Sequence, residues 1–84
     1  MRYSYIPQGI CPVEIFVTLD GDTVAEVDFI GGCDGNLKVL SRMARGMKTD
    51  SLIQLLSGIT CDDKDTSCGD QLAKAISAAI KAQS

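Results

Sequence analysis

The 84-residue chain contains no histidine and no tryptophan, and it has only two prolines. Without histidine, the chain cannot build the histidine-activated serine or cysteine nucleophile of a classical hydrolase. The sequence pattern also places no pair of carboxylates in a credible cleft, so acid–base catalysis is not indicated. Aromatic residues are few, and the core must therefore be built mainly from aliphatic side chains. The aromatic residues are Tyr3, Tyr5, Phe16 and Phe29.

An excess of basic residues is also missing, because eight Lys and Arg stand against eleven Asp and Glu, for a net charge of -3. A dedicated nucleic-acid binder usually carries a basic stripe, so direct nucleic-acid binding is not expected. No segment approaches the roughly 20 consecutive apolar residues of a membrane span. Met1 to Tyr5 do not open an apolar signal sequence. We therefore expect one cytoplasmic domain over residues 1–84, with no membrane association.

Cysteine is the residue that the chain has in unusual number, at Cys11, Cys33, Cys61 and Cys68. Disulfides rarely persist in the cytoplasm, where grouped cysteines more often bind metal or perform redox chemistry. Four thiolates without histidine suit a tetrahedral zinc ion, and an iron–sulfur cluster takes the same ligands. Because the chain has no Cys-x-x-Cys pair, redox-active or disulfide-forming cysteines and ordinary buried thiols stay open as alternatives.

The first half of the chain has the pattern of an antiparallel sheet. Residues 2–6 predict a short strand that ends at Pro7. Apolar residues alternate with polar ones through 13–19 and again through 23–30, on either side of a turn at 20–22. The two alternations therefore predict a hairpin, with a third strand before it.

The register of this hairpin follows from which residues alternate. A three-residue loop pairs Leu19 with Thr23 and places Ala25 on the inward face, because paired residues of an antiparallel ladder share a face. Cys11 then precedes the first hairpin strand and Cys33 follows the second. We expect these two cysteines to lie roughly opposite each other at the open end of the hairpin.

The second half of the chain predicts three helices. The first ends at about Arg45 before Gly46, the second is short and is capped by Thr49, and the third covers 68–82. Ser67 is expected to cap the third helix, which makes Cys68 its first residue. The helix dipole there favours a thiolate over a thiol. Together the elements predict an α+β fold, a small antiparallel sheet of two or three strands packed against three helices.

Other groups carry weaker signals, and each also has a purely structural interpretation. The glycine-rich segment 31–36 precedes a helix and could hold an anion, but it also suits a simple turn. A basic group could dock an acidic partner or phosphates, an acidic run could bind a hard cation, and an apolar face could form a homodimer. The basic group is Lys38, Arg42, Arg45 and Lys48; the acidic run is Asp62, Asp63 and Asp65; the apolar face is Phe16, Val24 and Ile30.

Residues 66–70, Thr-Ser-Cys-Gly-Asp, resemble the motif that gives the TSCPD domain its name. The resemblance extends over nearly the whole chain, through the blocks at 32–37, 56–61 and 66–73, and all four cysteines match characteristic positions of small stand-alone members. Gly69 stands where the family has proline. Glycine loosens a helix start that proline would preorganise.

Larger relatives carry this domain at the C-terminus of cobalamin-dependent ribonucleotide reductases. The resemblance therefore implies a link to ribonucleotide reduction, and through it to nucleotide binding and DNA synthesis, with a ribonucleoside-diphosphate reductase as partner or as transferred activity. A chain of 84 residues cannot supply the large radical-bearing barrel of that enzyme. We expect an accessory domain whose metal ligands are Cys11, Cys33, Cys61 and Cys68. The alternative is a thiol redox protein with Cys68 as nucleophile and Cys61 as resolving thiol.

Overall fold

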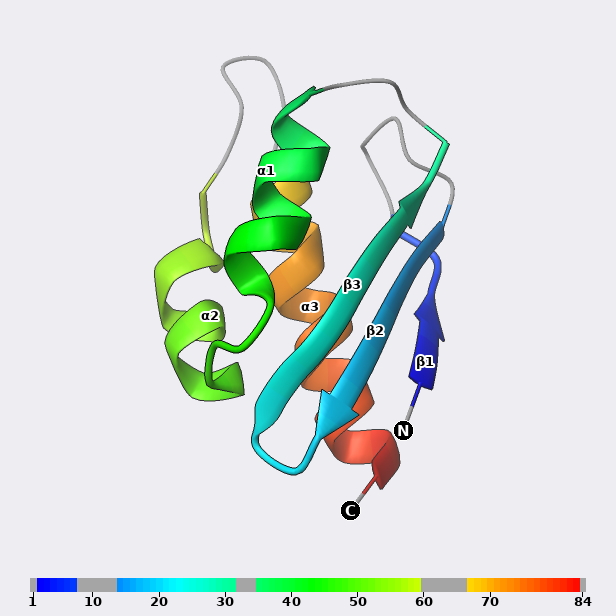
Figure 1. Ribbon diagram of the computed structural model, residues 1–84, viewed down its shortest axis with the longest axis vertical. Coiled ribbons are helices and arrows are strands. Elements are labelled where there is room, and N and C mark those ends of the chain that lie inside the picture. The colour runs from blue at the N-terminus through cyan, green and yellow to red at the C-terminus, as the bar shows by residue number, and fades with distance from the viewer. Residues whose placement is uncertain (1, 8–13, 32–34, 60–66, 84) are drawn as a thin grey trace.

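A computed structural model describes residues 2–7, 14–31, 35–59 and 67–83, apart from the side chains of Gly35, Asn36 and Cys68. The elements follow one another in the order expected, three strands and then three helices (Figure 1). The strands are β1 (Arg2–Tyr5), β2 (Glu14–Asp20) and β3 (Thr23–Ile30). The helices are α1 (Gly35–Ala44), α2 (Thr49–Leu56) and α3 (Cys68–Gln83). The α+β fold class is confirmed.

The three strands form one antiparallel sheet in the order β1-β2-β3. The register expected for the hairpin is wrong. Asp20 pairs with Thr23 across a two-residue turn, in which Gly21 has a φ of +62°, a backbone conformation suited to glycine. Between the pairs Leu19–Val24 and Thr18–Glu26 the register shifts, and Ala25 is the extra residue of a β-bulge. Without the extra residue, the two-residue turn would place Val27 on the outer face of the sheet. The bulge at Ala25 returns Val27 to the inward face, opposite Val17.

The bulge changes which side chains of β3 face the core. Val24 is fully buried and Ala25 is exposed, the reverse of the expected arrangement. The proposed dimer face of Phe16, Val24 and Ile30 therefore does not exist as one surface. The guanidinium of Arg2 also lies 4.4 Å from the centre of the Phe16 ring and partly covers it.

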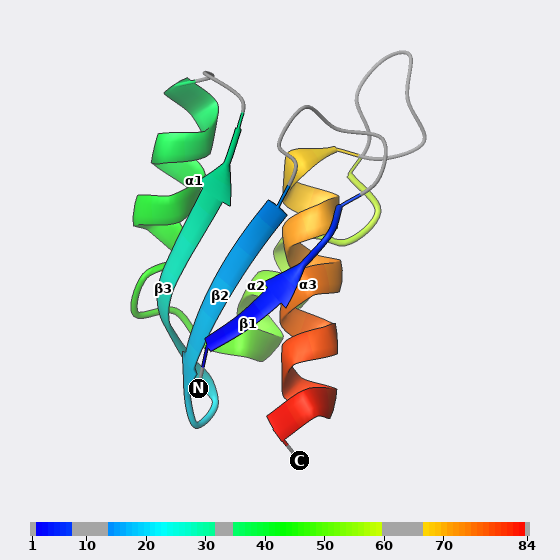
Figure 2. The same cartoon turned by 90° about the vertical axis from the view of Figure 1, so that its right-hand side faces the viewer.

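The core lies between one face of the sheet and the helices. α3 packs along β1 and β2, α1 runs beside β3, and α2 packs on α3 (Figures 1 and 2). α3 contributes an apolar stripe to this core, with Ile80 at its edge. The largest fully buried side chains are Ile15, Val17, Val24, Leu72 and Ile76. As expected, aliphatic residues form the centre, while Tyr3, Tyr5 and Phe29 pack around it.

The segment that links α1 to α2 continues the sheet beyond β3. The N–H of Val24 donates to the carbonyl of Met47 at 2.9 Å, and the N–H of Gly46 donates to the carbonyl of Val24 at 2.8 Å. Gly46 ends the first helix as predicted, with a φ of +84°. The prediction that Thr49 caps α2 is wrong, because Lys48 occupies the cap position and makes no side-chain cap bond. Thr49 instead donates its N–H to the carbonyl of Asp22 at 2.8 Å.

The arrangement brings the ends of several elements together. The end of β1, the start of β2, the end of β3, and the starts of α1 and α3 all lie at the upper end of the molecule in both views (Figures 1 and 2). None of the helices in the described ranges combines the length and the apolar content that crossing a bilayer demands.

Candidate functional site

The start of α3 is the best defined part of the candidate site. Ser67 precedes the helix and is buried, and its Oγ accepts a hydrogen bond from the N–H of Asp70 at 3.1 Å. The carbonyl of Ser67 accepts the N–H of Gln71 at 2.9 Å, which begins the helical ladder. Ser67 is therefore the N-cap that the sequence predicted. Its position makes Cys68 the first residue of α3, as expected.

Ser67 and Asp70 also bind the segment that follows α2. The Oγ of Ser67 donates to the carbonyl of Ile59 at 2.6 Å. The carboxylate of Asp70 accepts the N–H of Gly58 at 2.8 Å, and Gly58 has a φ of +80°. These bonds join residues 58–59 to residues 67–70, and we call this pair of bonds the stem. The sequence predicts the cap but not the stem, because no local signal links Asp70 to a backbone N–H twelve residues earlier.

Gly69 sits against the end of α2. A Cβ built at this position would lie 3.3 Å from Cδ2 of Leu56 and 3.8 Å from the Oγ of Ser67. The first is a tight contact, but Cδ2 is the terminal atom of a half-buried side chain. Glycine at this position thus allows α2 to approach the first turn of α3 closely.

The structure locates one of the four predicted ligands. Cys68 is at the first position of α3, while Cys11, Cys33 and Cys61 lie outside the described residues. Within the part of the chain that is described, no group of three or more cysteine, aspartate or glutamate side chains is arranged to hold a metal ion. The four-cysteine site therefore remains a prediction.

The observed register does relate two of the cysteines by sequence. Glu14 pairs with Ile30 at the open end of the hairpin, and this is the last described pair. Cys11 is three residues before Glu14, and Cys33 is three residues after Ile30. The register that contains the bulge thus gives the two cysteines the same offset from this pair.

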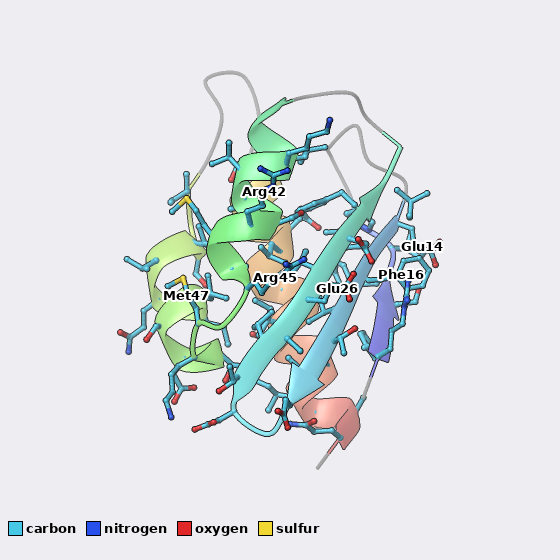
Figure 3. All side chains as sticks on the ribbon, viewed as in Figure 1. Glu14, Phe16, Glu26, Arg42, Arg45 and Met47 are labelled. Carbon is cyan, nitrogen blue, oxygen red and sulfur yellow. The ribbon has the colours of Figure 1, made fainter. Side chains whose placement is uncertain are left out.

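The basic group predicted from the sequence is divided in the structure. Lys38 and Arg42 are exposed on α1 and Arg45 is exposed just after its end, and no ion pair joins them to another described residue. Figure 3 shows Arg42 on α1 and Arg45 at the end of this helix, beside β3, which carries Glu26. Lys48 does not belong with them, because its Nζ lies 3.0 Å from the carboxylate of Asp22. This contact holds the pKa of Asp22 below its ordinary value, through the hydrogen bond first and the charge second.

The other weak candidates give no site. Asp62, Asp63 and Asp65 lie outside the described residues, as do residues 32–34 of the glycine-rich segment. Tyr3 and Tyr5 are half-buried and pack against the core.

A family model for the TSCPD domain matches residues 1–80. The chain belongs to the TSCPD domain family. Family membership supports the coarse link to ribonucleotide reductase that the resemblance implied, and leaves metal binding, redox chemistry and partners as proposals. No curated protein and no solved structure matches the chain.

Proposed function

We propose that this TSCPD domain is an accessory domain of ribonucleotide reduction, in which Cys11, Cys33, Cys61 and Cys68 hold one structural zinc ion. The proposal rests on one observation, that the ends of several strands and helices lie at the same end of the molecule. Each segment that contains a cysteine begins or ends at an element terminus at the same end of the molecule. Zinc bound there would crosslink the sheet, the α2 exit and α3, which an 84-residue chain with a modest core can use.

The stem supports a shared position for the second pair of cysteines. Ile59 and Ser67 are joined by a 2.6 Å hydrogen bond. Cys61 is two residues beyond Ile59, and Cys68 is the residue after Ser67. Because consecutive Cα atoms are only about 3.8 Å apart, a closed stem limits how far these two cysteines can separate. The equal offsets of Cys11 and Cys33 from the pair Glu14–Ile30 support the first pair in the same way.

The test is metal content together with single substitutions. Protein purified without a chelator should contain about one zinc per chain, with all four thiols protected until unfolding. Each of Cys11→Ser, Cys33→Ser, Cys61→Ser and Cys68→Ser should lower both the zinc content and the melting temperature. The double substitution Asp62→Asn with Asp63→Asn is the matched control and should leave zinc content unchanged. A serine variant with full zinc and an unchanged melting temperature removes that cysteine from the ligand set, and iron with visible absorption replaces zinc by an iron–sulfur cluster.

The redox alternative rests on the capped start of α3. A helix N-terminus favours the thiolate that a nucleophile needs, and a closed stem would limit the distance between Cys61 and Cys68. In this function the two thiols are oxidised to one disulfide, and the two electrons and two protons reduce a disulfide of the reductase to two thiols. Metal-free protein with two rapidly alkylated thiols at Cys61 and Cys68 would favour this function over the zinc site.

The proposed partner is a ribonucleotide reductase of the cobalamin-dependent type, in the cytoplasm. The exposed cations on α1, Lys38 and Arg42, are the proposed contact surface. Titration of the purified reductase with this chain, monitored by calorimetry, should give saturable binding that weakens with Lys38→Glu and Arg42→Glu. Binding that is absent, or indifferent to both substitutions and to salt, would reject this surface.

A further inference from the structure

The edge of the sheet at β1 is open. β1 pairs with β2 on one side only, whereas the outer edge of β3 pairs with residues 46–48 at Thr23 and Val24 and has α1 packed beside it. Among the described residues, no partner strand or loop bonds to the outer edge of β1. Figure 2 looks directly onto this edge, and no other labelled element crosses in front of β1. The strand therefore presents unpaired backbone N–H and C=O groups that another strand can bind.

This edge is short, with four residues in β1, but it lacks several other features that prevent pairing. β1 contains no proline and no bulge, and its inward-facing residues are Tyr3 and Tyr5 rather than charged residues. Ile6 follows the strand with its side chain 64% exposed, the highest value among the exposed large apolar residues described. The single charge on the strand is Arg2, at its start.

We propose that β1 pairs antiparallel with β1 of a second copy of this chain, with Ser4 opposite Ser4. Paired residues of an antiparallel ladder must share a face, so only registers that pair odd with odd positions continue the core face across the junction. The register centred on Ser4 is the one that pairs the whole segment Arg2–Ile6. It places Tyr3 of each copy opposite Tyr5 of the other, and such cross-strand aromatic pairs are favourable.

The charges agree with this register. Arg2 of each copy lies opposite Ile6 of the other, on the face of the sheet away from α3, so like charges do not meet. Each Ile6 gains a neighbour, and the two sheets become one six-stranded sheet with both helical layers on the same side. Five residues per copy form a small interface, so the dimer is weak and concentration-dependent.

The test uses the position that faces Arg2 of the other copy. Ile6→Lys places two pairs of like charges across the junction and should raise the dimer dissociation constant about tenfold in sedimentation equilibrium. Ile6→Glu places two pairs of opposite charges there and should lower it about fivefold. Because Ile6 is exposed, neither change disturbs the core, and an unchanged circular dichroism spectrum confirms that each variant folds.

Met43→Lys is the matched control, since Met43 is 63% exposed but lies on α1, away from β1. It should leave the dissociation constant unchanged. Combining Arg2→Glu with Ile6→Lys should restore dimerisation to at least the original level, because opposite charges meet again. A monomer up to millimolar concentration, a dimer weakened by Met43→Lys but not by Ile6→Lys, or equal effects of Ile6→Lys and Ile6→Glu would each overturn the proposal. Dimerisation through β1 needs no metal, so its outcome is independent of the zinc proposal.

Discussion

The backbone N–H of Gly58 donates a 2.8 Å hydrogen bond to the carboxylate of Asp70, twelve residues later in the chain. Asp70 is buried in the first turn of α3, and Gly58 lies just beyond the end of α2. The bond therefore fastens the end of one helix to the start of the next, directly beside Cys68. Asp70, the last residue of the motif at 66–70, therefore has a structural role that the motif itself does not reveal.

Removing the Asp70 carboxylate should destabilise the fold by about 1–3 kcal/mol, because the N–H of Gly58 loses a charged acceptor in a partly buried place. Asp70→Asn keeps one acceptor oxygen and should cost less than Asp70→Ala. Urea unfolding measures the free energy, and amide exchange should show faster exchange at Gly58. Lys74→Ala is the control, since Lys74 lies 3.7 Å from Asp70 but is largely exposed. An equal loss in both variants would assign the effect to the ion pair.

Gly69→Ala should stabilise the protein by about 0.5–1 kcal/mol, because alanine lowers the entropy of the unfolded chain at a helical position. The tight contact with Leu56 can be relieved by a small movement of its terminal methyl group. Thermal unfolding of Gly69→Ala, alone and combined with Leu56→Ala, measures this. If Gly69→Ala destabilises the original chain but stabilises the Leu56→Ala chain, the Leu56 side chain cannot move to relieve the contact.

Val24→Thr should cost about 1–3 kcal/mol, since it buries an additional hydroxyl at a fully buried site without changing shape. Ala25→Thr should stay within about 0.5 kcal/mol, because Ala25 is exposed in the bulge. Chemical unfolding of the two variants compares neighbouring positions with the same new residue. The register without a bulge makes the opposite prediction, so the larger loss at Ala25 would disprove the bulge.

The Asp22–Lys48 contact should give a local pH dependence. Lys48 lowers the pKa of Asp22, so the stabilisation from this pair is complete above the ordinary aspartate range and is lost as the pH falls through the lowered pKa. Carboxyl carbon NMR should show Asp22 titrating at lower pH than a free aspartate. Lys48→Met should return the pKa of Asp22 to the ordinary range. Lys38→Met, on the exposed face of α1, should leave the pKa of Asp22 lowered. An unchanged titration of Asp22 in Lys48→Met would reject the contact.

Local patterns were sufficient for the elements and for one cap. Alternation predicted β2 and β3 within a residue or two, and Ser67 was recognised because capping depends on adjacent residues. The register was mispredicted because a bulge leaves both alternations intact while it inserts Ala25 between them. Thr49 was misassigned because its N–H binds Asp22 of the hairpin, a tertiary contact without a local signal.

The same difference between local and tertiary signals applies to the candidate site. Sequence placed Cys68 at the start of α3, which the structure confirms, but it could not predict the stem. The stem depends on the spacing between α2 and α3 in three dimensions, and Gly69 and Leu56 set that spacing through packing. The ligand set at Cys11, Cys33 and Cys61 stays a prediction, to be decided by metal analysis.

The bulge at Ala25 also determines which changes in chain length the hairpin tolerates. Deleting Ala25 removes the unpaired residue and leaves every described pair of the hairpin as it is, so the offsets of Cys11 and Cys33 from the pair Glu14–Ile30 are unchanged. Deleting any paired residue of β3 instead shifts the strand by about 3.3 Å against β2. Position 25 is therefore where the hairpin can lose a residue without any change in its described pairing.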